Sequence, residues 1–157
     1  FKVHHPKAFY ASYFTVKSGD FDADFALGDV GLIKSEIKEL EAKGNNLPQK
    51  ERSLLVILEV VLEMYLRGIK FLPIDLYDSS PTRFLIRQEG ILPPLNTLQG
   101  VGTNAAYSID KARQEGKFLS IEDLRDRTKI TKTSIEVLRR HGALEGLSET
   151  NQLSLFG

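Results

Sequence analysis

The sequence of 157 residues contains no cysteine. This absence excludes disulfide bonds and thiolate metal sites, and it is compatible with a reducing cytoplasm. Long apolar runs are also lacking, because the longest one, which begins at Leu54, is interrupted by Glu59 and Glu63. It is shorter than the ~20 apolar residues that cross a bilayer. We therefore expect a cytoplasmic protein with no membrane contact.

Excess charge of one sign is missing as well, since 21 basic residues balance 21 acidic ones. The distribution is uneven. Residues 20–63 hold ten acidic and five basic side chains, whereas residues 99–140 hold nine basic and six acidic ones. A polyanionic partner is therefore expected to contact the second half. The sequence starts at Phe1 inside an amphipathic pattern, so we expect a piece of a longer protein.

Three helices are predicted in the first part of the chain, where apolar side chains recur every three to four positions. The first covers residues 5–19, with Pro6 in its first turn and Gly19 at its end. The second covers residues 27–44 and the third covers residues 45–68. The third is apolar on more than one face, which predicts that it is the central element of this half.

After Gly68 the apolar period changes from about 3.6 to about 2, which is typical of extended chain. Residues 69–76 are predicted to be extended, and residues 82–95 to form a β-hairpin around a turn at 88–90. The fold class is therefore mainly α with a small β-hairpin connector.

The helical period returns beyond Pro93 and Pro94. Ser120 and Asp123 form a capping box, and Thr131 or Thr133 is expected to cap the last helix. Further helices are predicted at 96–98, 103–114, 120–128 and 131–142. With the boundary near the two prolines, we expect four parts: helical residues 1–68, an extended connector 69–94, a helical domain 95–147 and a flexible tail 148–157.

Residues 98–109, LQGVGTNAAYSI, carry two glycines on either side of one apolar residue. The glycines allow a tight turn between two helices and leave bare N–H groups at the surface. These groups lie at a helix N-terminus, where the macrodipole favours an anion. The pattern predicts a site that binds a DNA phosphate without reading the base sequence, formed by Gly100, Val101, Gly102, Thr103 and Asn104. The alternative is a helix–helix turn with no ligand.

A degenerate second copy follows at residues 130–144, with similar apolar positions but without the two glycines. Such hairpins are often paired, one copy binding and the other mainly bracing it. Four basic side chains are candidates for phosphate contacts there: Lys129, Lys132, Arg139 and Arg140. The alternative for each of them is an ordinary solvated helix face.

Four stretches in this order resemble the C-terminal end of the bacterial C-family replicative DNA polymerase, the polymerase III alpha subunit of the Gram-positive PolC type. They are HPKAFYASYF, YLRGIKFLPIDL, LQGVGTNAAYSIDKARQEGKFLSIEDLRDRT and TSIEVLRRHGALEGL. The resemblance implies that residues 1–68 belong to the fingers region. It also implies that residues 95–147 form a tandem helix-hairpin-helix domain that binds double-stranded DNA. The remainder of the polymerase chain is then a further partner, and the replisome is the place of action.

The last residues of the chain resemble the peptide with which PolC-type polymerases dock into the bacterial sliding clamp, the β subunit. The pattern Q-L-[SD]-L-F is matched by Gln152, Leu153, Ser154, Leu155 and Phe156. The adjacent Leu155 and Phe156 suit one apolar pocket, while the glutamine amide satisfies polar groups at its edge. The alternative is a tail that folds back onto its own core.

No catalytic residue, metal or cofactor is expected within this segment, because the resemblance places the two magnesium ions of the polymerase in a palm outside the chain. Asp20, Asp22 and Asp24 alternate like a metal loop but lack its glycine and distal glutamate, so they are interpreted as helix N-terminal charges. Two other interpretations remain open. One is a stand-alone DNA-binding accessory domain of a nuclease or repair enzyme, and the other is a purely structural fingers segment.

Overall fold

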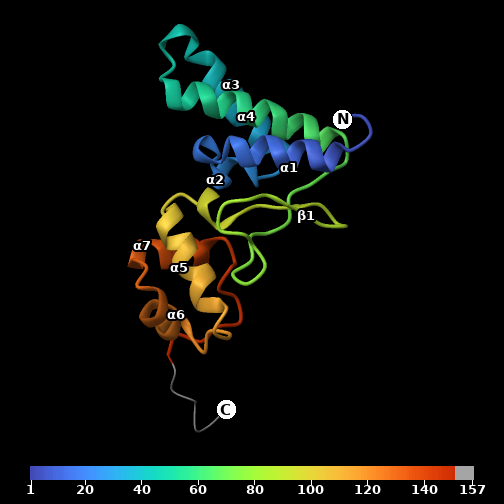
Figure 1. Cartoon of the computed structure of the whole chain (residues 1–157). Helices are drawn as coiled ribbons and strands as arrows, with labels where there is room; N and C mark the ends of the chain where they lie inside the picture. The colour runs from blue at the N-terminus through green and yellow to red at the C-terminus, as the bar shows by residue number, and fades with distance from the viewer. Residues whose placement is uncertain (151–157) are drawn as a thin grey trace.

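The computed structural model describes residues 1–150 as an elongated molecule with helices at both ends and extended chain between them (Figure 1). The first group comprises α1 (Pro6–Val16), α2 (Ala23–Ala26), α3 (Val30–Ala42) and α4 (Gln49–Leu66). The second comprises α5 (Thr103–Arg113), α6 (Ile121–Thr128) and α7 (Lys132–Arg140). Short 3-10 turns lie at Ser18–Asp20, Gly44–Asn46 and Leu95–Thr97. The predicted fold class, mainly α with a small β-hairpin, is confirmed. Across residues 1–150, no helix has the length and apolarity to cross a membrane.

Polar caps set the boundaries of the first helices and account for two differences from the prediction. Asp29 accepts a hydrogen bond from the Leu32 amide at 2.8 Å, so α3 begins at Val30. Asp22 caps the short helix α2, which the apolar period had not indicated, by accepting from the Asp24 amide at 2.9 Å. The first helix ends at Val16, earlier than expected, because the chain tightens into the 3-10 turn that follows.

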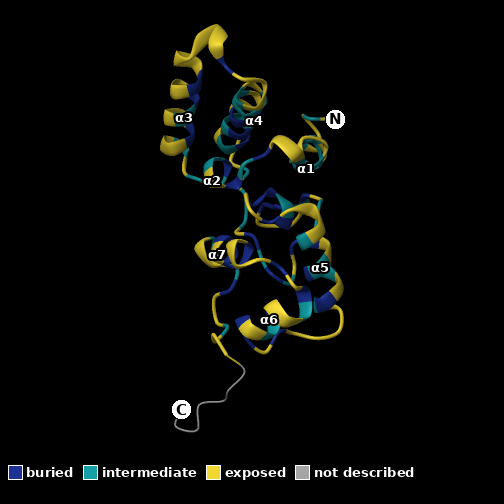
Figure 2. Ribbon diagram, turned by 90° about the vertical axis from the view of Figure 1, so that its left-hand side faces the viewer, coloured by how far each residue is buried: buried dark blue, intermediate teal, exposed yellow. Residues whose placement is uncertain are grey.

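An aromatic cluster forms the core of the first helical group. Phe14 of α1 and Phe21 are 0% and 1% exposed, and their ring centroids lie 5.6 Å apart. Phe84, from the extended chain, lies 5.0 Å from the Phe21 ring. The helix α4 buries Ile57, Leu58, Val61 and Met64, and α3 packs against it with its buried side inward (Figure 2). This packing is consistent with a central position for α4.

The extended chain carries the predicted β-hairpin, although each strand has only two residues. The strand β1 (Leu85–Ile86) pairs antiparallel with β2 (Ile91–Leu92). The turn between them closes through a hydrogen bond from the Arg87 amide to the Gly90 carbonyl at 2.8 Å. The Lys7 ammonium of α1 donates to the carbonyl groups of Arg87 and Gln88, which attaches this turn to the first helical group.

Side chains of the extended chain are divided between two hydrophobic cores. Phe84 and Ile91 belong to the core of the first helical group. Ile74 and Leu76 belong to the core formed by α5, α6 and α7. The second core therefore includes residues well upstream of the boundary expected near Pro93 and Pro94. The connector holds the two helical groups together by burying apolar area in both of them.

A polar contact also joins the two groups across more than a hundred residues of sequence. Arg140, at the end of α7, donates to both carboxylate oxygens of Asp24 at 3.0 and 3.2 Å. His141 Nε2 lies 2.8 Å from the same carboxylate. Burial alone would raise the pKa of Asp24, but the hydrogen bonds from His141 and Arg140 and the adjacent positive charge lower it below the ordinary range.

This lowered pKa predicts a pH-dependent contribution of Asp24 to stability. A carboxylate with a depressed folded-state pKa stabilises the fold above its unfolded-state pKa of about 4 and loses that effect as the pH falls below it. The Asp24→Asn variant should therefore be less stable than the wild type at pH 7, by up to about 1 kcal/mol for so exposed a pair. The difference should shrink by pH 3.

Urea unfolding at pH 7 and pH 3 measures both values. Asp126→Asn is the matched control, because Asp126 is an exposed carboxylate of α6 with no ion pair within residues 1–150. A wild-type advantage over Asp24→Asn that is as large at pH 3 as at pH 7 would contradict the prediction.

Candidate nucleic-acid interface

The first glycine pattern forms a tight turn between the 3-10 turn Leu95–Thr97 and α5. The Val101 amide donates to the Leu98 carbonyl at 3.0 Å, and both side chains are 1% exposed. Gly100 has a φ of +99°, a left-handed conformation that residues with a Cβ avoid. The turn is therefore held from inside by apolar anchors, while Gly100 and Gly102 remain at the surface.

In the part of the chain that the structure describes, no side chain caps the N-terminus of α5. Thr103 and Asn104 are exposed, and within residues 1–150 their backbone N–H groups have no protein acceptor. The α6 and α7 helices differ, because Ser120 and Thr131 accept hydrogen bonds from their first-turn amides. Free amides at a helix N-terminus are suited to bind an anion, to which the macrodipole adds.

The two glycines do not have the same role, contrary to the expectation that the turn requires both. Gly102 has a φ of −71° and a ψ of 171°, which any residue adopts, and a Cβ built there meets no atom of residues 1–150 within 4 Å. At Gly100 a Cβ would approach Val137 Cγ2 at 3.0 Å, in addition to the left-handed strain. The backbone therefore needs glycine at position 100, and position 102 is free of any steric demand from the fold.

The second hairpin repeats the first with different side chains. Lys129 occupies the left-handed position with a φ of +60°, in place of Gly100. Ile130 is the buried anchor. Thr131 takes the place of Gly102 and caps α7 by accepting from the Ser134 amide at 3.1 Å. The capped helix offers fewer free amides, so the second hairpin presents mainly side chains.

The two hairpins are joined directly. The Ser134 hydroxyl donates a hydrogen bond of 2.6 Å to the Gly100 carbonyl. A Cβ built at Gly100 would also lie 3.5 Å from the Thr133 methyl, in the first turn of α7. The N-terminal turn of α7 and the first hairpin are therefore neighbours.

The four predicted basic side chains fall into two pairs. Lys129 and Lys132 are exposed near the second turn and form no ion pair within the described part of the chain. Arg139 and Arg140 lie about 10 Å further along α7, at 1.5 Å per residue. Arg140 is paired with Asp24. The structure thus separates two available lysines from two arginines that are already engaged.

Arg139 lies between two carboxylates. Its guanidinium is 2.5 Å from Glu149 Oε1 and 3.6 Å from Glu136 Oε1. The hydrogen bond with Glu149 raises the pKa of Arg139. A phosphate would have to replace these partners before it reached the side chain.

Arg127 and Arg113 stabilise the fold through hydrogen bonds to backbone carbonyl groups. Arg127 donates to the carbonyl groups of Ala112, Gly116 and Lys117, and its guanidinium lies 4.5 Å from the Phe118 ring centroid. Arg113 donates to Asp110 and to the Leu76 carbonyl. These contacts remove two more cations from the surface charge that the sequence suggested.

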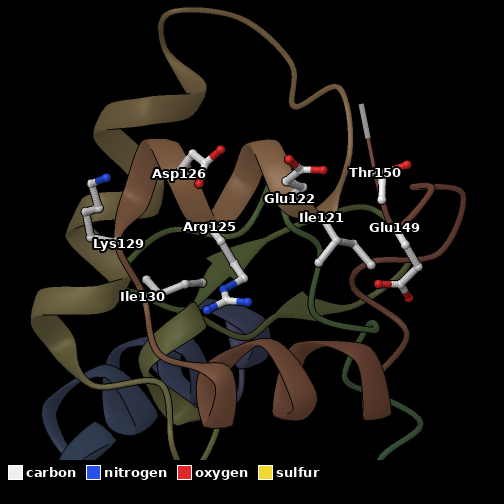
Figure 3. A pocket seen from close by; sticks show the side chains of 8 residues that line it. All are labelled: Ile121, Glu122, Arg125, Asp126, Lys129, Ile130, Glu149 and Thr150. Carbon is white, nitrogen blue, oxygen red and sulfur yellow. The ribbon is translucent and has the colours of Figure 1, made fainter. Parts of the chain in front are cut away.

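The sequence analysis did not single out Lys111 and Arg125, which are also exposed without an ion pair in residues 1–150. Arg125 stands one turn before Lys129 on α6 and extends into a cavity of about 610 Å³ (Figure 3). Glu122, Asp126 and Glu149 also line this cavity, so its charge is mixed. The sequence could have indicated Arg125, because it precedes Lys129 by four residues, which is the spacing of neighbours on one face of a helix.

The chain remains attached to α6 as far as the structure describes it. The Ile121 amide donates to the Ser148 carbonyl at 2.8 Å, and the Glu122 amide donates to the Glu149 carbonyl at 3.0 Å. Ser148, the predicted start of a flexible tail, is thus part of the folded domain. The candidate clamp-binding residues Gln152, Leu153, Ser154, Leu155 and Phe156 lie outside the described residues.

Acidic and histidine side chains do not gather into a metal site in the part of the chain that the structure describes. No three of them there are placed to hold an ion. Asp22 instead caps α2, and Asp24 binds Arg140, as described above.

Comparison with known proteins agrees with this geometry. A family model described as a helix-hairpin-helix motif matches residues 68–153. The chain belongs to the helix-hairpin-helix family. The match begins at Gly68, which fits the observation that Ile74 and Leu76 are buried in the core of the helix-hairpin-helix domain.

Nearly the whole chain is also homologous to PolC-type DNA polymerase III. It is 60% identical over 156 residues to that protein of Caldanaerobacter subterraneus subsp. tengcongensis and 55% identical over 157 residues to that of Clostridium perfringens. The protein of Bacillus subtilis is 50% identical over 156 residues. These alignments cover 99–100% of the chain. The chain spans about 11% of the length of these curated relatives.

The different roles of the two glycines can be tested by stability. Gly100→Ala should lower the free energy of unfolding by about 2 kcal/mol, because it adds a Cβ in a left-handed conformation against Val137. Gly102→Asp should leave stability unchanged or raise it slightly, since aspartate is a favourable N-cap residue and its site is open. Urea unfolding of both variants measures the difference. Equal losses at the two positions would contradict the assignment.

Proposed function

We propose that this segment is the part of a PolC-type DNA polymerase III that holds double-stranded DNA through its helix-hairpin-helix domain. The observation that carries the proposal is the uncapped N-terminus of α5, which begins at the exposed Gly102 within the family match. It offers backbone donors where an anion is favoured, and no side chain of residues 1–150 occupies them.

The contact follows from the chemistry of the two hairpins. A phosphate oxygen accepts hydrogen bonds from the amides of Thr103 and Asn104 at the first hairpin. Lys129 and Lys132, at the second hairpin, neutralise further phosphates. Backbone amides and lysine ammonium groups contact the DNA backbone and carry no information about the bases. Binding of this kind suits a polymerase, which must hold DNA of any sequence.

The other parts of the polymerase complete the activity in this proposal. Nucleotidyl transfer and the magnesium ions that it needs belong to the remainder of the polymerase chain, and this segment adds its hold on the duplex at the replisome. The high identity to the relatives includes the first helical group, residues 1–67, outside the helix-hairpin-helix match. That extent supports a polymerase segment over a stand-alone accessory domain of a nuclease or repair enzyme, for which the DNA-binding domain alone would suffice.

The C-terminal residues extend the proposal to the sliding clamp. Gln152, Leu153, Ser154, Leu155 and Phe156 provide a short peptide with two adjacent apolar anchors. The backbone of Ser148 and Glu149, a few residues earlier, is bonded to α6. The tether would therefore leave the polymerase from its DNA-binding domain, so that one domain holds both the duplex and the ring that encircles it.

The DNA contact predicts a specific pattern of affinities for a labelled duplex, measured by fluorescence anisotropy at several salt concentrations. Gly102→Asp should weaken binding at least tenfold, because its carboxylate occupies the free amides and repels phosphate. Lys129→Ala and Lys132→Ala should each weaken binding a few-fold and reduce the slope of log affinity against log salt by about 1.

Two controls keep this test specific. Gly102→Asn adds the same cap without the charge and should bind more tightly than Gly102→Asp. Lys38→Ala removes an exposed lysine of α3, at the far end of the molecule, and should change neither affinity nor slope. Undiminished duplex binding by a folded Gly102→Asp variant would rule out the first hairpin as the contact.

The clamp contact predicts that the chain truncated after Asn151 loses binding to an immobilised bacterial sliding clamp. The double substitution Leu155→Ala and Phe156→Ala should have the same effect, at least tenfold, because it removes both apolar anchors. Thr150→Ala should bind normally, and all three forms should keep their affinity for DNA. If the truncated chain binds the clamp as well as the intact one, the tether lies elsewhere.

A further inference from the structure

An exposed row of side chains runs along α5 away from the uncapped turn. Thr103, Tyr107 and Lys111 are spaced by four residues and therefore share one face of the helix. All three are exposed, and Tyr107 keeps 52% of its surface in contact with solvent. The opposite face of α5 packs into the core through Ala106, Ile109 and Ala112. The Tyr107 ring is thus exposed at the surface of the domain and is not part of its core.

The position of Tyr107 brings its ring close to the free amides. Side chains of a helix lean toward its N-terminus, so a residue covers the turn that precedes its own Cα. For Tyr107 that turn contains Thr103 and Asn104, which carry the uncapped N–H groups. Lys111 stands ~12 Å from Thr103 along the axis, and its long side chain leans back over the same face.

The charge along this row favours a polyanion. Asp110, next to Lys111 in the sequence, is held by Arg113, whose Nη2 and Nε lie 2.6 and 3.1 Å from its Oδ1. Glu115, an exposed carboxylate beyond the end of α5, lies at the far end of the row and lines a pocket together with Lys111. Lys111 has no ion pair within residues 1–150. The row therefore presents a hydroxyl, an aromatic ring and a free ammonium group in sequence.

The second hairpin provides an internal comparison. The residues of α7 that correspond to Thr103, Tyr107 and Lys111 are Lys132, Glu136 and Arg140. Glu136 puts an exposed carboxylate where α5 has its tyrosine, and Arg140 is bound to Asp24. The row on α7 thus contains a charge that repels phosphate and a cation that is already occupied. Only α5, of these two helices, has a face suited to a longer contact.

We propose that the DNA strand held by the first hairpin continues along this face of α5. The Tyr107 ring packs against the deoxyribose next to the bound phosphate, and Lys111 binds a phosphate further along the same strand. Lys111 stands ~12 Å from Thr103 along the helix axis, so the phosphate that it binds is a different one from the phosphate held by the hairpin. Sugar and phosphate are the same in every nucleotide, so this contact also ignores sequence. The inference rests on the proposed function and lengthens its contact.

The test uses the full chain and a labelled duplex, with affinity measured over a range of salt concentrations. Tyr107→Ala should weaken binding about fivefold without changing the salt slope, because the ring carries no charge. Tyr107→Phe should stay within about twofold of the wild type. Tyr107→Glu, which copies the second hairpin, should weaken binding at least tenfold. Lys111→Ala should weaken it about threefold and lower the salt slope by about 1.

The outcomes separate this inference from the proposed function on which it rests. Should Tyr107→Ala and Lys111→Ala bind like the wild type while Gly102→Asp binds weakly, the hairpin contact stands and the extension along α5 is wrong. A wild-type chain that does not bind the duplex overturns both. Because these side chains are exposed, each variant should keep the wild-type urea midpoint, which is measured alongside. A Tyr107→Phe variant as weak as Tyr107→Ala would show that the ring does not make the contact.

Discussion

The hydrogen bond from the Ser134 hydroxyl to the Gly100 carbonyl, at 2.6 Å, fixes the arrangement on which the proposed interface depends. It joins the first hairpin to the first turn of α7, and the two segments lie so close that a Cβ at position 100 would touch Val137. The free amides of α5 and the lysines of the second hairpin are therefore held by rigid elements. A site positioned in this way binds without first ordering its own parts, which lowers the entropic cost of association.

The two hairpins share a backbone pattern but differ in whether a side chain caps the helix that follows. A first-turn amide cannot donate fully to a capping side chain and to a phosphate at the same time. In α7 the Thr131 hydroxyl accepts a hydrogen bond from the Ser134 amide, which stabilises that helix and leaves the lysines to face outward. Gly102 leaves the amides of α5 unpaired, at a cost in helix stability that a bound anion would offset. The degenerate copy can thus brace the fold while the glycine copy keeps its donors free.

Local patterns in the sequence predicted the helices of the second half closely, because Ser120 and Thr131 mark their starts by hydrogen bonds within a few residues. The turn around 88–90 was predictable for the same reason. The partners of Arg140 and Arg127 were not predictable, because Asp24 lies 116 residues from Arg140 and the carbonyl groups around Arg127 face it only after α5 and α6 have packed. Counting charges therefore overestimated how many cations remain available. The unequal roles of Gly100 and Gly102 likewise depend on backbone angles that residue type does not reveal.

These pairings explain how a chain with no net charge is suited to a polyanion. Several arginines of the second half are used to hold the fold together, and one of them joins the two helical groups through Asp24. What remains near the hairpins is a small set of donors: backbone amides, Arg125, Lys129, Lys132 and the row on α5. With 21 charges of each sign, the whole segment exerts little long-range attraction on DNA, so the affinity that we propose must come from these short-range contacts. In the proposed role, a hold that is local, modest and independent of sequence would let the duplex advance by one nucleotide after each addition, because every new register offers the same sugar and phosphate groups.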